Sequence, residues 1–359
     1  MDDDIRFIVE SGLYAASGDN LQELRWIVCG HTLQIERQDK DDILNQISDG
    51  RAAALSLGAM VENAVIAATA RKYRTQVTYS SDPSGSGVVA TLVVEPDANI
   101  SPDPLARELA NRVTNRKAYT RTPLTAEERT SILGVADAKS DVRLIEDPRS
   151  ISTLARAVVI YDELIFSIRI LHNKFFHLIN WTKRADDRRR IGLYFPTLAS
   201  PPFSLGPLWF LRTWLFARAS HLFRGPYLIA LRQRHIYRQA SAYGAVIVHQ
   251  DKIHDWIDAG RTIERLWLVA TQKGLSLHPL TGTIFIALGS HTEPVQQMLS
   301  AEQGARVLAG YADIKKIFAV TEGTVAFMFR IGHGAPPSAR TSRLPTEQMV
   351  DVVPATKAA

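Results

Sequence analysis

The sequence has a single cysteine, Cys29, and lacks the residue spacings that mark metal or disulfide sites. One cysteine excludes an internal disulfide framework and a thiolate metal centre, since both need several sulfur atoms. The ten histidines form no HExxH-like pair. Cys29 lies in the strand-like run IVCGHTLQI, which favours a buried structural thiol over a nucleophile. We therefore expect no metal site and a reducing, cytoplasmic setting.

A large excess of charge of one sign is also missing. The formal net charge is only +5, and basic residues gather in just one run, KRADDRRR at 183–190. Such a run is typical of a solvated helix face, and no basic-plus-aromatic nucleic-acid motif accompanies it. The acidic start, MDDDIRFIVE, has no signal-peptide profile. This charge balance permits an anionic ligand but gives no reason to expect a nucleic-acid partner.

Long uninterrupted apolar runs are absent as well. The most apolar and aromatic stretch, 203–223, contains Pro207, Arg212, Arg218 and His221. A membrane-spanning helix needs about 20 apolar residues with few charges. We therefore predict no transmembrane segment and a helix that covers a pocket or a partner surface. A helix lying on a membrane surface stays an alternative.

At 359 residues, with 46% apolar and 22% charged residues, the chain is an ordinary globular protein with two domains or one duplicated domain. Its periodicity and turn residues predict an α+β protein. Residues 182–235 lack a clean period and are interpreted as an insert of irregular helices. The predicted helices are 3–16, two within 40–73, 106–118, 125–138, those from about 150 to 180, and 254–274; the predicted strands are 25–30, 32–37, 76–80, 88–95, 142–147, 245–250 and 325–332.

Two helical segments match each other when the chain is shifted by 202 residues. GAMVENAVIAATARKY then lies on GRTIERLWLVATQKGL without a gap, so that Gly58 meets Gly260 and Glu62 meets Glu264. Two unrelated amphipathic helices share apolar periodicity but seldom these identities. The match favours an internal duplication.

The stretch LYAASGDNLQELRWIV, residues 13–28, places small polar groups between a helix and a strand. It resembles the APSxHNxQPWxF stretch of nitroreductase-like FMN flavoproteins, in particular their fused-dimer branch, which includes Acg-like proteins and domains joined to E1-like (ThiF-type) enzymes. Further stretches that resemble this family are DGRAAALSLGAMVENAVIAA, NRVTNRKAY, WIDAGRTIERLWLVATQKGLSLHPLTG and FRIGHGAPPSARTSRLP.

The resemblance implies a nitroreductase-like α+β fold in which tandem halves form an intramolecular pseudo-dimer. The implied divisions are 1–100 for the first half, 101–181 for the start of the second, 182–235 for an insert or lid, and 236–359 for the remainder with an arginine tail. Each half lacks a motif that the other keeps, which implies one FMN per chain.

The resemblance also implies which residues bind the cofactor. Ser17, Gly18, Asn20 and Gln22 would contact the ring or ribityl chain or hold their loop. Pro279, Leu280, Thr281 and Gly282 would lie at flavin N5. The phosphate would be held by Arg112, Thr114 and Arg116 with Arg340 and Arg343 of the tail, and Arg330 is an outside candidate. Guanidinium groups suit phosphate because they form planar, charge-assisted hydrogen bonds.

Each assignment has a structural alternative. Arg112 and Arg116 are four apart, which on a helix gives one shared face, and they could equally form surface ion pairs. Ser17 and Asn20 suit a helix-capping turn, and the LHPLTG loop suits a plain strand connection.

The implied function is the NAD(P)H-dependent reduction or oxidation of a small-molecule substrate through one non-covalent FMN, with no catalytic side chain assigned. Two departures favour an alternative, a catalytically weak FMN-sequestering protein or a partner module of an E1-like enzyme. The family's Gln-Pro-Trp is replaced by Gln22-Glu23-Leu24. The aromatic residues of the insert region could form a lid, a seal or a docking surface: Trp181, Phe203, Trp209, Phe210, Trp214 and Tyr227.

Overall fold

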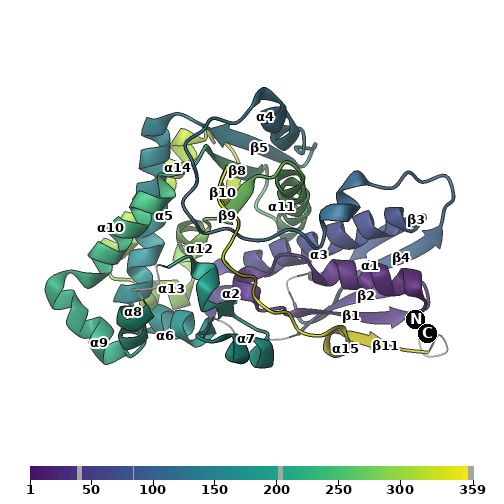
Figure 1. The fold of residues 1–359 in the computed structure, drawn as a ribbon, viewed down its shortest axis with the longest axis horizontal. Coiled ribbons are helices and arrows are strands. Elements are labelled where there is room, and N and C mark those ends of the chain that lie inside the picture. Colours follow the sequence, from purple (N-terminus) through teal and green to yellow (C-terminus); the bar gives the residue numbers. More distant parts are fainter. Residues whose placement is uncertain (39–42, 84, 201–204, 355–359) are drawn as a thin grey trace.

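Two β-sheets, each packed against one long helix, form the architecture of this α+β protein (Figure 1). The structure is a computed structural model that describes residues 1–38, 43–83, 85–200 and 205–354. The first sheet has the order β11-β1-β2-β4-β3, and the second has the order β5-β8-β10-β9. The strands are β1 Leu24–Cys29, β2 Thr32–Arg37, β3 Tyr73–Tyr79, β4 Gly87–Pro96, β5 Ser140–Ile145, β8 Ala242–Val248, β9 Ser276–Pro279, β10 Thr324–Gly332 and β11 Val350–Val352.

The two sheets share one plan. Without β11, every pair of neighbouring strands is antiparallel, and the order β1-β2-β4-β3 corresponds to β5-β8-β10-β9. The long helices α3 (Arg51–Ala70) and α11 (Ile253–Gln272) follow β2 and β8 in the chain. Both helices have 20 residues, and their first residues are 202 positions apart. This is the shift at which their sequences match.

The two long helices cross at a pair of glycines. A β-carbon on Gly58 would lie 2.0 Å from the carbonyl oxygen of Ile257, and one on Gly260 would lie 2.3 Å from that of Leu55. Leu55 and Ile257 are themselves 202 positions apart. The backbones can approach this closely only because neither glycine has a side chain.

The remaining helices pack mostly against one another or against the two long helices. Helix α1 (Asp3–Leu13) packs on α3, and the Asp2 carboxylate caps it by accepting from the backbone N–H of Ile5 at 2.8 Å. Helix α5 (Pro148–Ser167) contacts α10 (Gly225–Tyr237), α12 (Gly282–Leu288) and α14 (Ala301–Ile317). The shorter elements are α2 Ile43–Ser48, α4 Ala126–Leu133, α6 Arg169–Leu178, α7 Lys183–Arg189, α8 Leu205–Leu211, α9 Trp214–Ser220, α13 Glu293–Met298, α15 Thr346–Met349 and the two-stranded pair β6 Ile179–Asn180 and β7 Leu193–Tyr194.

Among the described residues, one helix is long and apolar enough to span a bilayer. It is α3, and 83% of its apolar 18-residue stretch is buried inside the protein. The described part of the aromatic stretch 203–223 is divided among α8, α9 and a 3-10 helix, His221–Phe223, and residues 201–204 lie outside the described part of the chain.

The predicted helix at 106–118 is wrong. Only a short 3-10 helix, Pro104–Glu108, forms there, and Thr114 makes a parallel β-bridge with Leu277. The Asn115 side chain donates to Ser276 Oγ and to the carbonyl of Ala335, both at 2.8 Å. These distant partners and the helix-disfavouring Val, Thr and Asn residues keep the segment extended.

Candidate functional site

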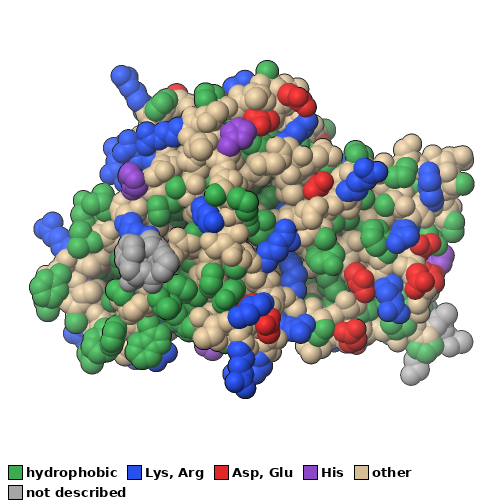
Figure 2. Space-filling view, viewed as in Figure 1, with side chains coloured by type: hydrophobic (Ala, Val, Ile, Leu, Met, Phe, Trp, Pro, Cys, Tyr) green, Lys and Arg blue, Asp and Glu red, His purple; other side chains and the backbone are tan. Residues whose placement is uncertain are grey.

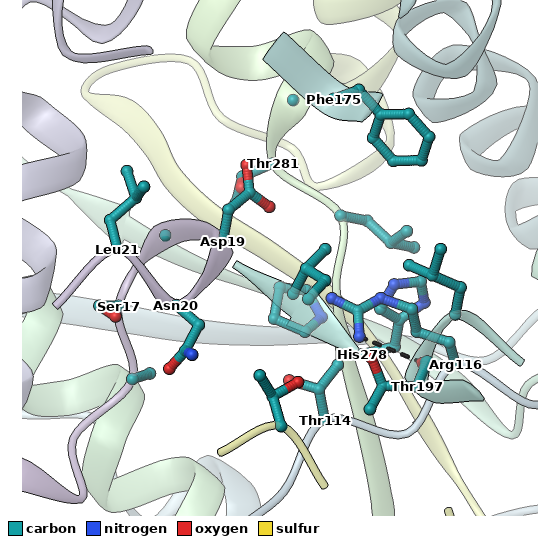
Figure 3. Close-up of a pocket in the computed structure, with 18 of the residues that line it drawn as sticks. Ser17, Asp19, Asn20, Leu21, Thr114, Arg116, Phe175, Thr197, His278 and Thr281 are labelled. Atoms are coloured by element: carbon teal, nitrogen blue, oxygen red, sulfur yellow. Dashed lines mark hydrogen bonds between the residues drawn. The ribbon is translucent and has the colours of Figure 1, made fainter. Parts of the chain in front are cut away.

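A cavity of about 690 Å³ lies between the first-sheet and second-sheet parts of the chain. Residues from the 16–21 loop, the extended 109–116 segment, the 278–282 turn and the 339–343 tail line it, together with α5, α6 and the 182–235 insert (Figure 3). A volume of this size is typical of a small-molecule or cofactor site. Of the thirteen residues predicted to bind a cofactor, twelve line the cavity: Ser17, Gly18, Asn20, Arg112, Thr114, Arg116, Pro279, Leu280, Thr281, Gly282, Arg340 and Arg343.

Gln22, the thirteenth, lies outside this cavity and lines a small neighbouring one. Its amide nitrogen donates to the Arg190 carbonyl at 2.6 Å, and its amide oxygen accepts from the Leu344 backbone N–H at 2.9 Å. The Asn20 amide similarly donates to the carbonyls of Gly192 and Ser342 at 3.2 and 3.1 Å. These two side chains therefore fasten the loop to both the insert and the tail.

The 17–22 loop adopts strained backbone conformations. Asp19, Asn20 and Gln22 have positive φ angles of 47°, 57° and 50°. Such angles are uncommon for residues other than glycine and persist where surrounding contacts hold them. The loop shaped in this way lines the cavity through Ser17, Asp19 and Asn20 (Figure 3).

Three arginines, Arg112, Arg340 and Arg343, form an arginine cluster at the cavity wall. The Tyr14 carbonyl accepts from Arg112 at 2.8 Å and from Arg343 at 3.2 Å, and Arg340 donates to the Ala110 carbonyl at 2.6 Å. Arg112 also forms an ion pair with Glu264 at 2.9 Å. Burial and the nearby Arg112 charge lower the pKa of Arg343 to about 10. Three guanidinium groups facing one contacting carboxylate make this end of the cavity positive.

Arg116 lies beside His278 and Thr197 (Figure 3), and among the described residues it shares no hydrogen-bond partner with this cluster. Its guanidinium donates to the Thr197 carbonyl at 3.3 Å. Burial lowers the pKa of Arg116 below its ordinary value, and the Asp19 charge opposes that shift. The expectation that Arg112 and Arg116 share a helix face is wrong, since neither belongs to a helix.

Arg330, the outside candidate, does not line the cavity and is fully buried. It donates to the carbonyls of Arg116 and Lys117 at 2.9 and 2.7 Å, and its guanidinium lies 4.2 Å from the Tyr119 ring centroid. Arg330 therefore orders the backbone that carries Arg116.

The 279–282 turn is fixed from two sides. The Leu280 N–H donates to the Met328 carbonyl at 2.7 Å, and the Thr283 hydroxyl donates to the carbonyls of Ala157 and Val158, each at 3.0 Å. A β-carbon on Gly282 would lie 2.2 Å from the Tyr161 ring, so this position requires glycine. The turn leads from β9 directly into α12, and a strand-to-strand connection is excluded.

Several cavity residues escaped the sequence analysis, among them Asp19, Asp162, Tyr237 and His278. Burial raises the pKa of Asp162 to about 7, and the hydrogen bond from the Tyr237 hydroxyl at 3.3 Å opposes the rise. Burial and the charges of Arg330 and Arg116 hold the pKa of His278 well below its ordinary range. Asp19 stood inside the SGDN motif, whereas nothing in the helical pattern around Asp162 distinguished it from a solvated carboxylate.

The insert contributes aliphatic and polar residues to the cavity, including Leu198, Leu208, Ile229 and Arg232. The described aromatic residues singled out in the sequence do not line it. Trp181 stacks between Phe176 and Phe195, and Trp209, Phe210 and Tyr227 are exposed. Phe203 lies outside the described residues. No cluster of three or more His, Cys, Asp or Glu side chains in the described part of the chain could hold a metal ion.

Comparison with known proteins gives distant sequence matches. An uncharacterized Mycobacterium tuberculosis protein, MT1398, is 24% identical over 94% of this chain, which spans only 46% of that protein. A putative NAD(P)H nitroreductase of the same species, MT3217, is 24% identical over 291 residues, covering 79% of this chain and 77% of the relative. In sequence the chain is nitroreductase-like. No family model matches it.

Solved structures with similar elements are also distant. The FMN-dependent nitroreductase NfnB of Mycobacterium smegmatis, in complex with NADPH, has 12% identity and a TM-score of 0.39, covering 68% of this chain and 96% of that one. A nitroreductase of Bacteroides fragilis with bound FMN has 11% identity and a TM-score of 0.37, covering 70% and 99%.

Proposed function

We propose that this chain is an FMN-dependent oxidoreductase of the nitroreductase type, which binds one FMN in the cavity and uses NAD(P)H as electron donor. The observation that carries the proposal is the convergence of twelve predicted residues from four separate segments on one cavity. The printed name of MT3217, a putative NAD(P)H nitroreductase, supports the same activity.

The arginine cluster is the best fit for the FMN phosphate. Arg340 and Arg343 donate to backbone carbonyls, which are neutral, so among the described residues Glu264 is the only carboxylate in contact with the cluster. A dianionic phosphate would complete the charge balance and accept charge-assisted hydrogen bonds. Arg116, whose hydrogen-bond partner Thr197 is not one of the cluster's partners, would instead face the flavin ring together with His278.

The turn before α12 offers the donors for the ring. The Leu280 N–H is already bonded to Met328, so Thr281 and Gly282 are left as the backbone donors at this edge. Bound FMN would supply the redox chemistry, taking a hydride from a nicotinamide and passing reducing equivalents to an acceptor. The protein would contribute orientation, a fixed backbone donor and the positive charges of Arg116 and buried Arg330 near the ring.

The chain also has the features of two fused subunits, and we infer an intramolecular pseudo-dimer. The shared strand order, the equal lengths of α3 and α11 and the reciprocal contacts of Gly58 and Gly260 support it. The polar contacts are reciprocal too: Glu62 pairs with Arg265 at 2.7 Å, and the equivalent Glu264 faces Asn63. An isologous contact of this kind is characteristic of two-fold interfaces.

A second candidate function is flavin binding without turnover, alone or as a partner module of an E1-like enzyme. The observation that favours it is the insert, whose Leu198, Leu208 and Ile229 form part of the cavity wall. If the insert covers the flavin, a nicotinamide would not reach the ring.

A visible absorption spectrum distinguishes these functions. The purified protein, incubated with FMN and freed of excess, should show flavin bands that bleach when NADPH or NADH is added anaerobically. Bands that persist with both nicotinamides would favour the binding protein. A protein that stays colourless after incubation would overturn both proposals.

A further inference from the structure

An exposed apolar surface covers α8, α9 and α10, on the outer side of the insert. We call it the hairpin face (Figure 2, lower left). Its most exposed members lie at the turn between α9 and α10, where Leu222 is 83% and Phe223 79% exposed. Contiguous exposed apolar patches of this kind mark interaction sites. The hairpin face consists of Leu205, Trp209, Phe210, Leu215, Phe216, Leu222, Phe223, Tyr227, Leu228 and Leu231.

The charge of this region has one sign only. From 205 to 238 the sequence contains the arginines 212, 218, 224, 232, 234 and 238 and no lysine, aspartate or glutamate. Arg212, Arg218 and Arg224 are exposed among the apolar residues, and the structure gives them no ion pair with any described residue. Arg212 lies 3.9 Å from the Trp209 ring centroid, with its charge at the surface.

The helices that carry the hairpin face are fixed to the rest of the protein on their inner side. His172 Nε2 bonds to the Leu211 carbonyl at 2.7 Å, and His221 Nε2 bonds to the Phe166 carbonyl at 3.1 Å. Ala217 is buried, and the Trp214 ring packs against His172. The apolar side chains on the outer side therefore project from a fixed platform.

We propose that the hairpin face docks on the surface of an anionic lipid bilayer, with Leu222 and Phe223 inserted among the acyl chains. Apolar side chains interspersed with arginines match a layer in which hydrocarbon lies beneath phosphates. The arginine stems can lie along apolar surface while the guanidinium groups contact the phosphates. A second copy of the chain fits this face less well, because a two-fold contact would place unpaired arginines against one another.

The cavity extends behind the same elements. Leu208 of α8 and Ile229 of α10 line it, as do the apolar side chains of Phe166, Leu171 and Phe175. Docking would bring this apolar part of the cavity next to the bilayer. The substrate class that fits is an apolar electron acceptor dissolved in the membrane, and this part of the inference rests on the proposed function.

Vesicle sedimentation tests the docking itself. The full chain should sediment with vesicles of equal phosphatidylcholine and phosphatidylglycerol, and much less with phosphatidylcholine alone or in 1 M salt. The double variant Leu222→Asp/Phe223→Asp should bind the anionic vesicles at least about tenfold more weakly. The control Leu308→Asp places an aspartate at an exposed leucine of α14, outside the hairpin face, and should bind the anionic vesicles as the parent protein does.

Three results would overturn the docking. The first is no binding of the parent protein to anionic vesicles, and the second is equal binding by the double variant. The third is a parent protein that forms a dimer in solution and does not bind vesicles, together with a double variant that is monomeric. Turnover then separates docking from activity. With NADPH and an apolar quinone in the vesicles, the double variant should lose reduction of the quinone but keep reduction of a water-soluble acceptor. Vesicle binding without reduction of either acceptor would leave docking standing and refute the proposed function.

Discussion

The Nε atom of Arg330 donates a hydrogen bond to Nδ1 of His278 over 3.2 Å, and both side chains are buried. Since Nδ1 must accept, His278 is neutral and carries its proton on Nε2. Protonation of His278 would place a second positive charge against a buried guanidinium. This contact links the protonation of a cavity residue to the backbone that carries Arg116.

Acid should therefore destabilise the protein through His278. Its native pKa lies well below the ordinary value, so below about pH 6.5 the unfolded chain binds a proton there that the native chain does not. The free energy of unfolding should fall by at most about 2 kcal/mol from this residue between pH 7 and 5, the limit set by the ordinary pKa of histidine. His278→Gln keeps an acceptor for Arg330 and should lose this pH dependence in urea titrations. An unchanged slope in the variant would contradict the assignment.

Asp162 should make the free energy of unfolding depend on pH in the opposite direction from His278. Its native pKa is raised to about 7 by burial, whereas an unfolded aspartate loses its proton near pH 4. Between these values the native state binds more protons, so the contribution of Asp162 to stability declines as pH rises from about 4 to 7. Asp162→Asn should remove this decline, and unfolding measured from pH 4.5 to 8 should show the variant gaining on the parent protein with rising pH. A constant difference would refute the raised pKa.

Gly58→Ala should destabilise the helix crossing. The new methyl group would meet the Ile257 carbonyl at 2.0 Å, and the backbone of α11 would have to move away. We expect a loss of about 1–3 kcal/mol in chemical denaturation. Gly304→Ala is the control, because it lies in α14 with nothing within 4 Å and should stabilise by about 0.5–1 kcal/mol. Similar effects from both substitutions would mean that the close crossing has no energetic weight.

Gln22 should hold the tail and the insert through different atoms. Gln22→Glu keeps the oxygen that accepts from the Leu344 N–H but cannot donate to the Arg190 carbonyl, whereas Gln22→Met loses both bonds. Each lost bond to a buried group should cost about 1–3 kcal/mol. Hydrogen exchange at Leu344 should accelerate strongly in Gln22→Met and less in Gln22→Glu. Equal acceleration in the two variants would exclude the two-sided role.

Arg340→Gln tests the phosphate assignment. Arg340 is exposed at the cavity and contacts only backbone carbonyls among the described residues, so its loss should leave stability within about 0.5 kcal/mol. FMN affinity, followed by fluorescence quenching, should fall about 10- to 100-fold with the loss of a charge-assisted contact. Arg129→Gln, which removes an exposed arginine paired with Glu146, should bind FMN as the parent does. An unaltered FMN affinity in Arg340→Gln would contradict the assignment of the phosphate to the arginine cluster.

Much of the fold was predictable because its elements carry strong local patterns. The apolar periodicity of 51–70 and 253–272 predicted both long helices, and the hairpin at 24–37 followed from alternation around a glycine turn. The 106–118 segment was mispredicted since its conformation depends on Asn115 bonding to Ser276, 161 positions away. No local pattern carries such a contact.

The candidate site was likewise predictable where local motifs carry it and unpredictable where it depends on distant contacts. Motif resemblance pointed to most of the predicted residues that line the cavity, but it could not tell that Arg116 bonds to the Thr197 carbonyl, because Thr197 belongs to the insert, 81 positions away. Nor could it find β11, whose three residues gain their strand conformation by pairing with β1.

That pairing has a consequence for the order in which the protein forms during synthesis. Val350 of β11 lies opposite Trp26 of β1, 324 positions earlier in the chain, and Arg25 contacts Asp351 at 3.0 Å. On the ribosome, the outer edge of β1 stays unpaired until β11 itself has emerged. An open strand edge is a template for pairing with other chains. Nascent or truncated chains that end before β11 are thus the ones most exposed to aggregation, whatever the stability of the finished protein.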